Sequence, residues 1–231
     1  MTEPLNPARA KKGKDAPSAA EPAKPIPLQN IETLQVPDSK FGMSFLLLGS
    51  TRSGKSTLVN YLFERYFKKH ISILMSNSLQ SDAYKPLLKK CVVSDLYHPE
   101  VLKDLYMINH STKNHYPFLV ILDDLTHVRN DKQYQRLLTI YRNSRISCLI
   151  VAQSSSIMNA SGRTNINFVC LFKLNSDEEI EKVIKKYLIS RFPTSMKMAD
   201  KIRFYRQATE DHHFFFIDNF TGNVCLTKIS V

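Results

Sequence analysis

The chain has 231 residues, of which 43% are hydrophobic and 23% are charged, and its formal net charge is +11. This length and composition suit one folded domain with a tail, and they exclude a wholly disordered or collagen-like chain. No apolar run approaches the ~18 residues that a membrane-spanning helix needs.

Residues 1–40 differ in composition from the rest of the chain. They hold seven of the eleven prolines, separated mostly by alanine, lysine and glutamate. Such a segment cannot bury enough apolar surface to offset its ordering entropy, so we expect a disordered tail at 1–40 and one folded domain at 41–231. Residues 41–231 carry +10 of the net charge, which favours a polyanionic partner, nucleic acid before membrane.

From residue 41 onward, short apolar runs alternate with stripes of helical spacing. The apolar runs predict buried strands at Met43–Leu48, Ile71–Met75, Cys91–Val93, Phe118–Leu122, Ile146–Ala152 and Asn167–Leu174. The stripes predict helices over Lys55–Lys69, Asp82–Lys89, Pro99–Ile108, Asp131–Arg142, Ser176–Ile189 and Lys197–Arg206. Ser176 and Glu179 have the spacing of a capping box.

The chain closes with two strand-like runs, Phe214–Asp218 and Val224–Ile229, which flank a turn containing Thr221-Gly222. This pattern predicts an antiparallel β-hairpin. Together with the alternation before it, the hairpin predicts an α/β fold with a mostly parallel central sheet flanked by helices.

Gly49–Ser56 reads GSTRSGKS and matches the pattern G-x-x-x-x-G-K-[ST]. It follows a predicted strand and opens a predicted helix, which is the context that a phosphate-binding loop (P-loop) requires. We expect Lys55 to reach the β- and γ-phosphates of ATP and Ser56 to bind Mg²⁺. The residues predicted to contact the nucleotide are Gly49, Ser50, Thr51, Arg52, Ser53, Gly54, Lys55, Ser56 and Thr57.

Polar residues follow two other predicted strands. Asp123 ends the run Phe118–Leu122, where a carboxylate next to a P-loop holds Mg²⁺, and Asp124 is the candidate to polarise an attacking water. Gln153 follows Ile146–Ala152, where an amide can contact both water and γ-phosphate. A strand inserted between the P-loop strand and the carboxylate strand, with a polar sensor strand after it, indicates the RecA-like branch of P-loop NTPases that adds an acidic base (ASCE type).

The Gly49–Thr57 loop, the box Ile121–Asp124 and the spacing from Arg142 to Gln153 together resemble the FtsK–HerA superfamily. Within it they are most similar to the small genome-packaging ATPases of double-jelly-roll-capsid DNA viruses, both poxvirus-type and tectivirus-type. The resemblance covers about residues 41–231. Two departures stand out: Asp124 replaces the usual glutamate, and Asn143 replaces the histidine that tends to follow the arginine in poxvirus-like members.

The resemblance implies an Mg²⁺-dependent ATPase that drives double-stranded DNA into a preformed capsid. It also implies a homo-oligomeric ring, a hexamer or pentamer, with capsid portal or vertex proteins as partners and only indirect membrane contact. The expected location is the packaging vertex of the virion and the host cell interior during assembly. In such a ring Arg142, or else Arg145, acts as an arginine finger on the neighbouring subunit.

The DNA-contacting surface is less determined by the sequence. Candidates are the loop Ser161–Thr164 and the basic residues Lys182, Lys185, Lys186, Arg191, Lys197, Lys201, Arg203 and Arg206. Two other functions also fit a P-loop in a chain of this size. One is a nucleotide or small-molecule kinase, and the other is a virus morphogenesis ATPase that acts on protein partners.

Overall fold

The computed structural model describes residues 26–33 and 41–229, and a single sheet runs through this part of the chain. Its strand order is β3-β2-β4-β5-β1-β6-β7-β8. Strands β1 to β6 are parallel to one another, whereas β7 pairs antiparallel with both β6 and β8 and forms a hairpin with β8. The strands are β1 (Ser44–Leu48), β2 (Ile71–Ser76), β3 (Val92–Ser94), β4 (Phe118–Asp123), β5 (Ile146–Ala152), β6 (Phe168–Leu171), β7 (Phe214–Asp218) and β8 (Asn223–Thr227).

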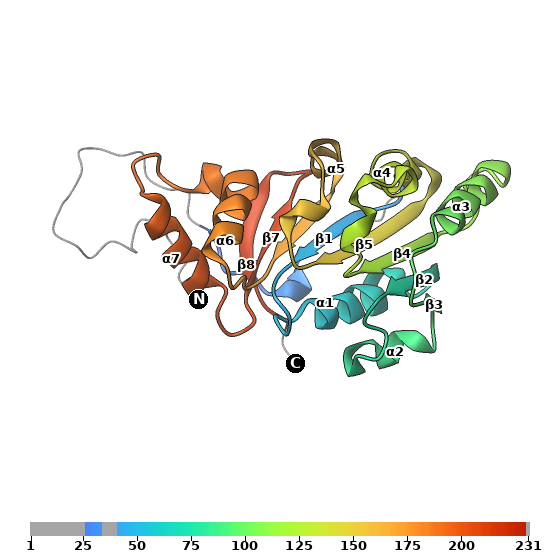
Figure 1. The fold of residues 1–231 in the computed structure, drawn as a ribbon, viewed down its shortest axis with the longest axis horizontal. Helices are drawn as coiled ribbons and strands as arrows, with labels where there is room; N and C mark the ends of the chain where they lie inside the picture. Colours follow the sequence, from blue (N-terminus) through green and yellow to red (C-terminus); the bar gives the residue numbers. More distant parts are fainter. Residues whose placement is uncertain (1–25, 34–40, 230–231) are drawn as a thin grey trace.

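Helices cover both faces of this sheet (Figure 1). The α-helices are α1 (Lys55–Leu62), α2 (Lys85–Leu88), α3 (Pro99–Ser111), α4 (Lys132–Thr139), α5 (Ala160–Asn165), α6 (Asp177–Val183) and α7 (Met198–Ala208). Single π-helical segments, η3 (Phe63–Phe67) and η8 (Ile184–Leu188), extend α1 and α6. The 3₁₀ turns are η2 (Ile31–Thr33), η4 (Asp82–Tyr84), η5 (Thr126–Asn130), η6 (Tyr141–Ser144), η7 (Ser155–Ile157) and η9 (Ile189–Arg191).

The core consists of two apolar layers, one on each face of the sheet. Side chains alternate along β1: Leu46 and Leu48 pack with α3, α4, α6 and α7, whereas Phe45 and Leu47 pack with α1. This alternation follows from the two-residue period of a strand, and it explains why a strand covered on both faces is apolar throughout. Within the described ranges, no helix is both long and apolar enough to cross a membrane.

The β5 strand lies between β1 and β4, so the inserted strand and the polar sensor strand are one and the same. This sheet order agrees with the predicted RecA-like α/β fold. The two strands that follow the P-loop helix in the chain, β2 and β3, lie on the far side of β4.

Residues 26–33 correct part of the predicted tail. Ile26 is fully buried, and a backbone bridge joins Leu28 to Leu226 on β8. The amide of Leu226 donates to the carbonyl of Pro27, and a proline suits the outer edge of a sheet because it still offers its carbonyl. Ile26 and Ile31 supply enough apolar surface to dock this stretch, and the rest of the 1–40 prediction lies outside the described residues.

Candidate functional site

The P-loop connects β1 to α1, and two glycines allow its tight path. Gly54 has φ of 103°, a left-handed conformation that glycine adopts without strain. A Cβ atom on Gly49 would lie 2.6 Å from both the Cβ of Phe172 and the Oγ of Ser53, so only glycine fits there. The amide of Ser50 donates to the carbonyl of Lys173 at 2.8 Å, which fixes the loop to the end of β6.

Lys55 opens α1 and is the half-buried cation of the loop. Its Nζ donates to the carbonyl oxygens of Gly49 at 2.8 Å and Ser50 at 2.7 Å. Burial lowers the pKa of Lys55, and the charges of Asp123 and Asp124 oppose that shift. The ammonium is therefore held at the loop by two neutral acceptors, which a phosphate oxygen can replace.

Strand register brings the predicted polar residues to the same edge of the sheet. Leu48 pairs with Ala152 and Asp123 pairs with Val151, so the chain leaves β1, β4 and β5 at one level. There the Nε2 of Gln153 donates to the Oδ2 of Asp124 at 3.3 Å, while the Oε1 of Gln153 accepts from Thr51 Oγ1 at 3.5 Å. Gln153 thus spans the distance between the P-loop and the second acid.

The two adjacent acids differ in their surroundings. Asp123 is buried, and its Oδ2 accepts a hydrogen bond from the hydroxyl of Ser76 at 2.8 Å. Burial raises the pKa of Asp123, and hydrogen bonding to Ser76 opposes the rise. Asp124 has φ of 54°, an uncommon conformation for a residue with a side chain, and this bend turns it away from Asp123 toward Gln153.

The donor set around Asp123 fits Mg²⁺. The Asp123 carboxylate, the Ser56 hydroxyl and the hydroxyl of Tyr84 lie near one another, and the Tyr84 oxygen is buried without a hydrogen bond of ordinary geometry among the described residues. The same part of the chain contains no cluster of three or more His, Cys, Asp or Glu that could hold a metal ion. A few oxygen donors beside a phosphate site are the usual setting for Mg²⁺.

These groups line one pocket with a volume of about 860 Å³. Its lining includes Thr51–Thr57 together with Asp123, Asp124 and Gln153. Five further lining residues were not anticipated from the sequence: Phe172, Asp211, His212, Lys228 and Ile229. Asp211 and His212 both have positive φ values, 53° and 61°, in the turn that leads into β7. The pocket is large enough for a nucleotide.

The predicted arginine fingers are outside this pocket in their own chain. Arg142 lies in η6 just before β5, and its Nη1 contacts the carbonyl oxygen of Asn165 at 3.4 Å. Arg145 donates to the carbonyl oxygen of His115 at 3.0 Å. Because β5 has seven residues, its two ends are roughly 20 Å apart, which separates both arginines from Gln153.

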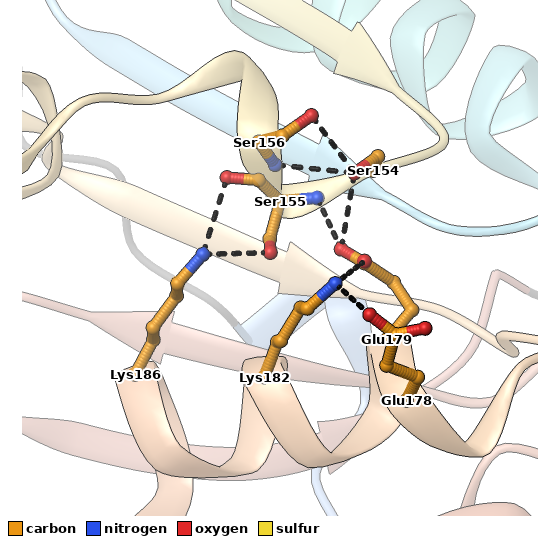
Figure 2. Close-up of polar contacts among 7 residues, drawn as sticks. All are labelled: Ser154, Ser155, Ser156, Glu178, Glu179, Lys182 and Lys186. Atoms are coloured by element: carbon orange, nitrogen blue, oxygen red, sulfur yellow. Dashed lines mark hydrogen bonds and ion pairs between the residues drawn. The ribbon is translucent and has the colours of Figure 1, made fainter.

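A network of polar side chains holds the turn that follows Gln153 (Figure 2). Glu179 on α6 accepts from the backbone amide of Ser155 and from the hydroxyl of Ser154. Lys186 donates to the hydroxyl of Ser155 at 2.8 Å, and Lys182 lies within 3.9 Å of Glu179. The predicted capping box is therefore wrong: Ser176 makes no side-chain cap, because Glu179 bonds to η7 instead.

Most of the candidate DNA-binding cations have partners within the chain. Lys182, Lys185, Arg203 and Arg206 form ion pairs with acids, and Lys201 is buried over the ring of Phe192. Arg191 donates to the carbonyl of Gly222, and Arg163 donates to that of Met158. The structure therefore does not gather these residues into one patch of unpaired charge.

Comparison with known proteins gives one family. The family model described as Poxvirus A32 protein matches residues 32–221, and no curated protein sequence matches the chain. This match confirms the resemblance to the poxvirus-type members that the motifs indicated.

Solved structures share the fold at low sequence identity. The DNA-packaging ATPase B204 of Sulfolobus turreted icosahedral virus has a TM-score of 0.59 and 16% identity, with 84% of this chain and 100% of B204 covered. B204 of Sulfolobus turreted icosahedral virus 2, in complex with AMPPCP, has a TM-score of 0.58 and 14% identity, with 83% and 100% covered. The pCW3 conjugation coupling protein TcpA has a TM-score of 0.57 and 12% identity, with 82% of this chain and 60% of TcpA covered.

The Glu179 network leads to a prediction about stability. Glu179→Ala removes the acceptor of the buried Ser155 amide, and we expect the free energy of unfolding to fall by about 1–3 kcal/mol. The neighbouring Glu178 is exposed and forms an ion pair with Lys182, so Glu178→Ala should leave the free energy of unfolding nearly unchanged. Urea unfolding at pH 7 measures both, and equal losses would contradict this role of Glu179.

Proposed function

The chain belongs to the Poxvirus A32 protein family, and on this basis we propose that it is an ATP-driven motor that moves viral double-stranded DNA into a preformed capsid. The observation that carries the proposal is the convergence of Lys55, Asp124 and Gln153 in one pocket beside the P-loop. The shared fold of genome-packaging NTPase B204, which is known in complex with AMPPCP, supports the same proposal.

In the proposed reaction each polar group has a separate task. Lys55 exchanges the carbonyls of Gly49 and Ser50 for the β- and γ-phosphates of ATP. Asp124 accepts the proton of the attacking water, and Gln153, already bonded to Asp124, orients that water against the γ-phosphate. Ser56 and Asp123 would hold Mg²⁺, which neutralises charge on the phosphate oxygens.

We further propose a homo-oligomeric ring in which Arg142 serves the pocket of a neighbouring subunit. Its distance from the pocket of its own chain, at the other end of β5, supports a role in trans, and Arg145 is the alternative. The ring would be a hexamer or pentamer at the packaging vertex, acting with capsid portal or vertex proteins inside the host cell. A positive net charge of +11 suits a duplex DNA substrate.

The function is tested by ATP hydrolysis with and without linear duplex DNA. We expect DNA to stimulate turnover in the parent protein, and Lys55→Ala to lower turnover by about 100-fold or more, because a catalytic electrostatic partner is lost. Lys103→Ala, an exposed lysine outside the pocket, is the matched control.

Two other outcomes would identify a different function. Phosphoryl transfer to an added nucleoside monophosphate would show a kinase. An ATP hydrolysis rate that is the same with and without duplex DNA would favour a morphogenesis ATPase that acts on protein partners. Either result contradicts the packaging motor.

Replacing each of the two acids, Asp123 and Asp124, with asparagine should have different effects on nucleotide affinity and on turnover. Asp124→Asn is expected to bind ATP and Mg²⁺ like the parent protein and to hydrolyse ATP at least about 100-fold more slowly, since an amide cannot accept the proton. Asp123→Asn should also weaken the Mg²⁺-dependent part of nucleotide affinity. Titration with a fluorescent ATP analogue, beside turnover, measures both. Equal loss of affinity in the two variants would remove the division of roles.

The trans arginine is tested by mixing two inactive variants. Arg142→Ala subunits keep an intact pocket, and Lys55→Ala subunits keep Arg142, so the mixture should hydrolyse ATP faster than either variant alone. Repeating the mixture with Arg145→Ala distinguishes the two arginines. The assay is run without DNA, where coupling between subunits is looser, and subunit exchange is confirmed independently. If the mixture then hydrolyses ATP no faster than either variant alone, Arg142 does not act on a neighbouring subunit.

A further inference from the structure

Tyr84 is a buried side chain at the pocket that the proposed reaction has not used. The residue is 1% exposed and packs in the same apolar layer as α1, yet it lines the nucleotide pocket. Its hydroxyl has no hydrogen bond of ordinary geometry among the described residues, although Ser56 and Asp123 both lie beside it. A buried hydroxyl without a partner is costly, so its presence requires an explanation.

A run of hydrogen bonds fixes Tyr84 relative to Asp123. The Ser76 hydroxyl donates to Asp123 Oδ2 at 2.8 Å and accepts from the amide of Ser78 at 2.9 Å. The amide of Ser81 donates to the carbonyl of Ser78 at 3.0 Å, and the amide of Tyr84 donates to that of Ser81 at 3.0 Å. This series of hydrogen bonds runs from Asp123 through the β2–η4 connection to the backbone of Tyr84, whose hydroxyl lies beside Asp123.

A second tie joins the same segment to the P-loop helix. The Nδ2 of Asn60 on α1 donates to the carbonyl of Ala83 at 2.6 Å. Ser56 lies one turn earlier on α1, so a single hydrogen bond connects the backbone next to Tyr84 with the helix that carries Ser56. Tyr84 is thereby held between the two residues that we expect to bind Mg²⁺.

The chemistry of the hydroxyl makes it a donor. A phenol has an ordinary pKa of about 10, so the hydroxyl carries its proton at neutral pH. A protonated phenol beside a carboxylate can donate to one of its oxygens and so limit how the carboxylate turns. Packing does not require the hydroxyl, because a phenylalanine ring would fill the same space in the apolar layer.

We propose that Tyr84 is a positioning residue, whose hydroxyl donates to the Asp123 carboxylate when nucleotide and Mg²⁺ are bound and keeps that carboxylate directed toward Ser56. This inference rests on the proposed nucleotide site. It assigns Tyr84 no contact with the reacting atoms, so its effect passes through Asp123. Groups that orient metal ligands commonly change metal affinity by 10- to 100-fold when they are removed.

The test compares Tyr84→Phe with Tyr187→Phe. Tyr187 on η8 also has a buried hydroxyl with no hydrogen-bond partner among the described residues, and it lies outside the pocket, so it is the matched control. Affinity for a fluorescent ATP analogue is measured in EDTA and across a Mg²⁺ titration. Mn²⁺ binding in the presence of the nucleotide is followed by electron paramagnetic resonance, and melting temperature is measured without ligand.

We expect Tyr84→Phe to melt at the same temperature as the parent protein or higher, because a buried unpaired hydroxyl is removed. Its affinity in EDTA should be unchanged, whereas the Mg²⁺ and Mn²⁺ concentrations needed for half-saturation should rise about 10-fold. Tyr187→Phe should leave all metal dependence unchanged.

Three results would overturn the inference. A metal dependence equal to that of the parent protein shows that the hydroxyl does not act on Asp123. A lower melting temperature together with weaker binding in EDTA shows a structural role only. An equal shift in Tyr187→Phe shows a general effect of removing a buried hydroxyl. If the parent protein itself binds no nucleotide, the proposed function fails, which is distinct from a failure confined to Tyr84.

Discussion

The parallel pairing of β5 with both β1 and β4 is the constraint on which the site depends. It aligns Leu48 with Ala152 and Asp123 with Val151, so the residues that leave these strands meet at one edge. Because side chains alternate along a strand, a shift of one residue in the pairing of β4 with β5 would turn Asp123 into the opposite layer of the core. The apolar residues on both faces therefore fix the position of the polar ones at the strand ends.

That edge carries a balance of buried charge. Lys55 loses favourable hydration on burial and is compensated by two backbone carbonyls and by the nearby acids. Burial disfavours the ionised form of Asp123, and the hydrogen bond from the Ser76 hydroxyl favours it. A bound triphosphate would place negative charge beside the Lys55 ammonium, and a bound divalent cation would place positive charge beside the Asp123 carboxylate. The pocket is thus arranged for both ligands together, and each should favour the other.

The sequence was most informative where chemistry and backbone geometry coincide. The GSTRSGKS motif predicted the loop because Gly54 adopts a positive φ and Gly49 lies too close to its neighbours to carry a Cβ atom. The buried strands were predicted from their continuous apolar runs. Asp123 and Gln153 were predicted from their place after such runs. Ser76 carries the same signal, because it also follows an apolar run at the end of a strand, Ile71–Ser76.

Other features depend on contacts between distant segments, which spacing does not encode. Glu179 has the spacing of a capping box, yet its carboxylate bonds to a turn 24 residues earlier. Ile26 sits among prolines and still docks against the sheet, because β8 presents an open edge. Tyr84 and His212 carry no local pattern that marks them, and only the fold brings them to the pocket.

The most direct test of the account is an experimental structure with a non-hydrolysable ATP analogue and Mg²⁺. We predict that Lys55 Nζ leaves the carbonyl oxygens of Gly49 and Ser50 and contacts the β- and γ-phosphates, with the triphosphate between the P-loop and Gln153. A nucleotide bound elsewhere, while Lys55 keeps both carbonyl contacts, would contradict the assignment of this pocket as the nucleotide site.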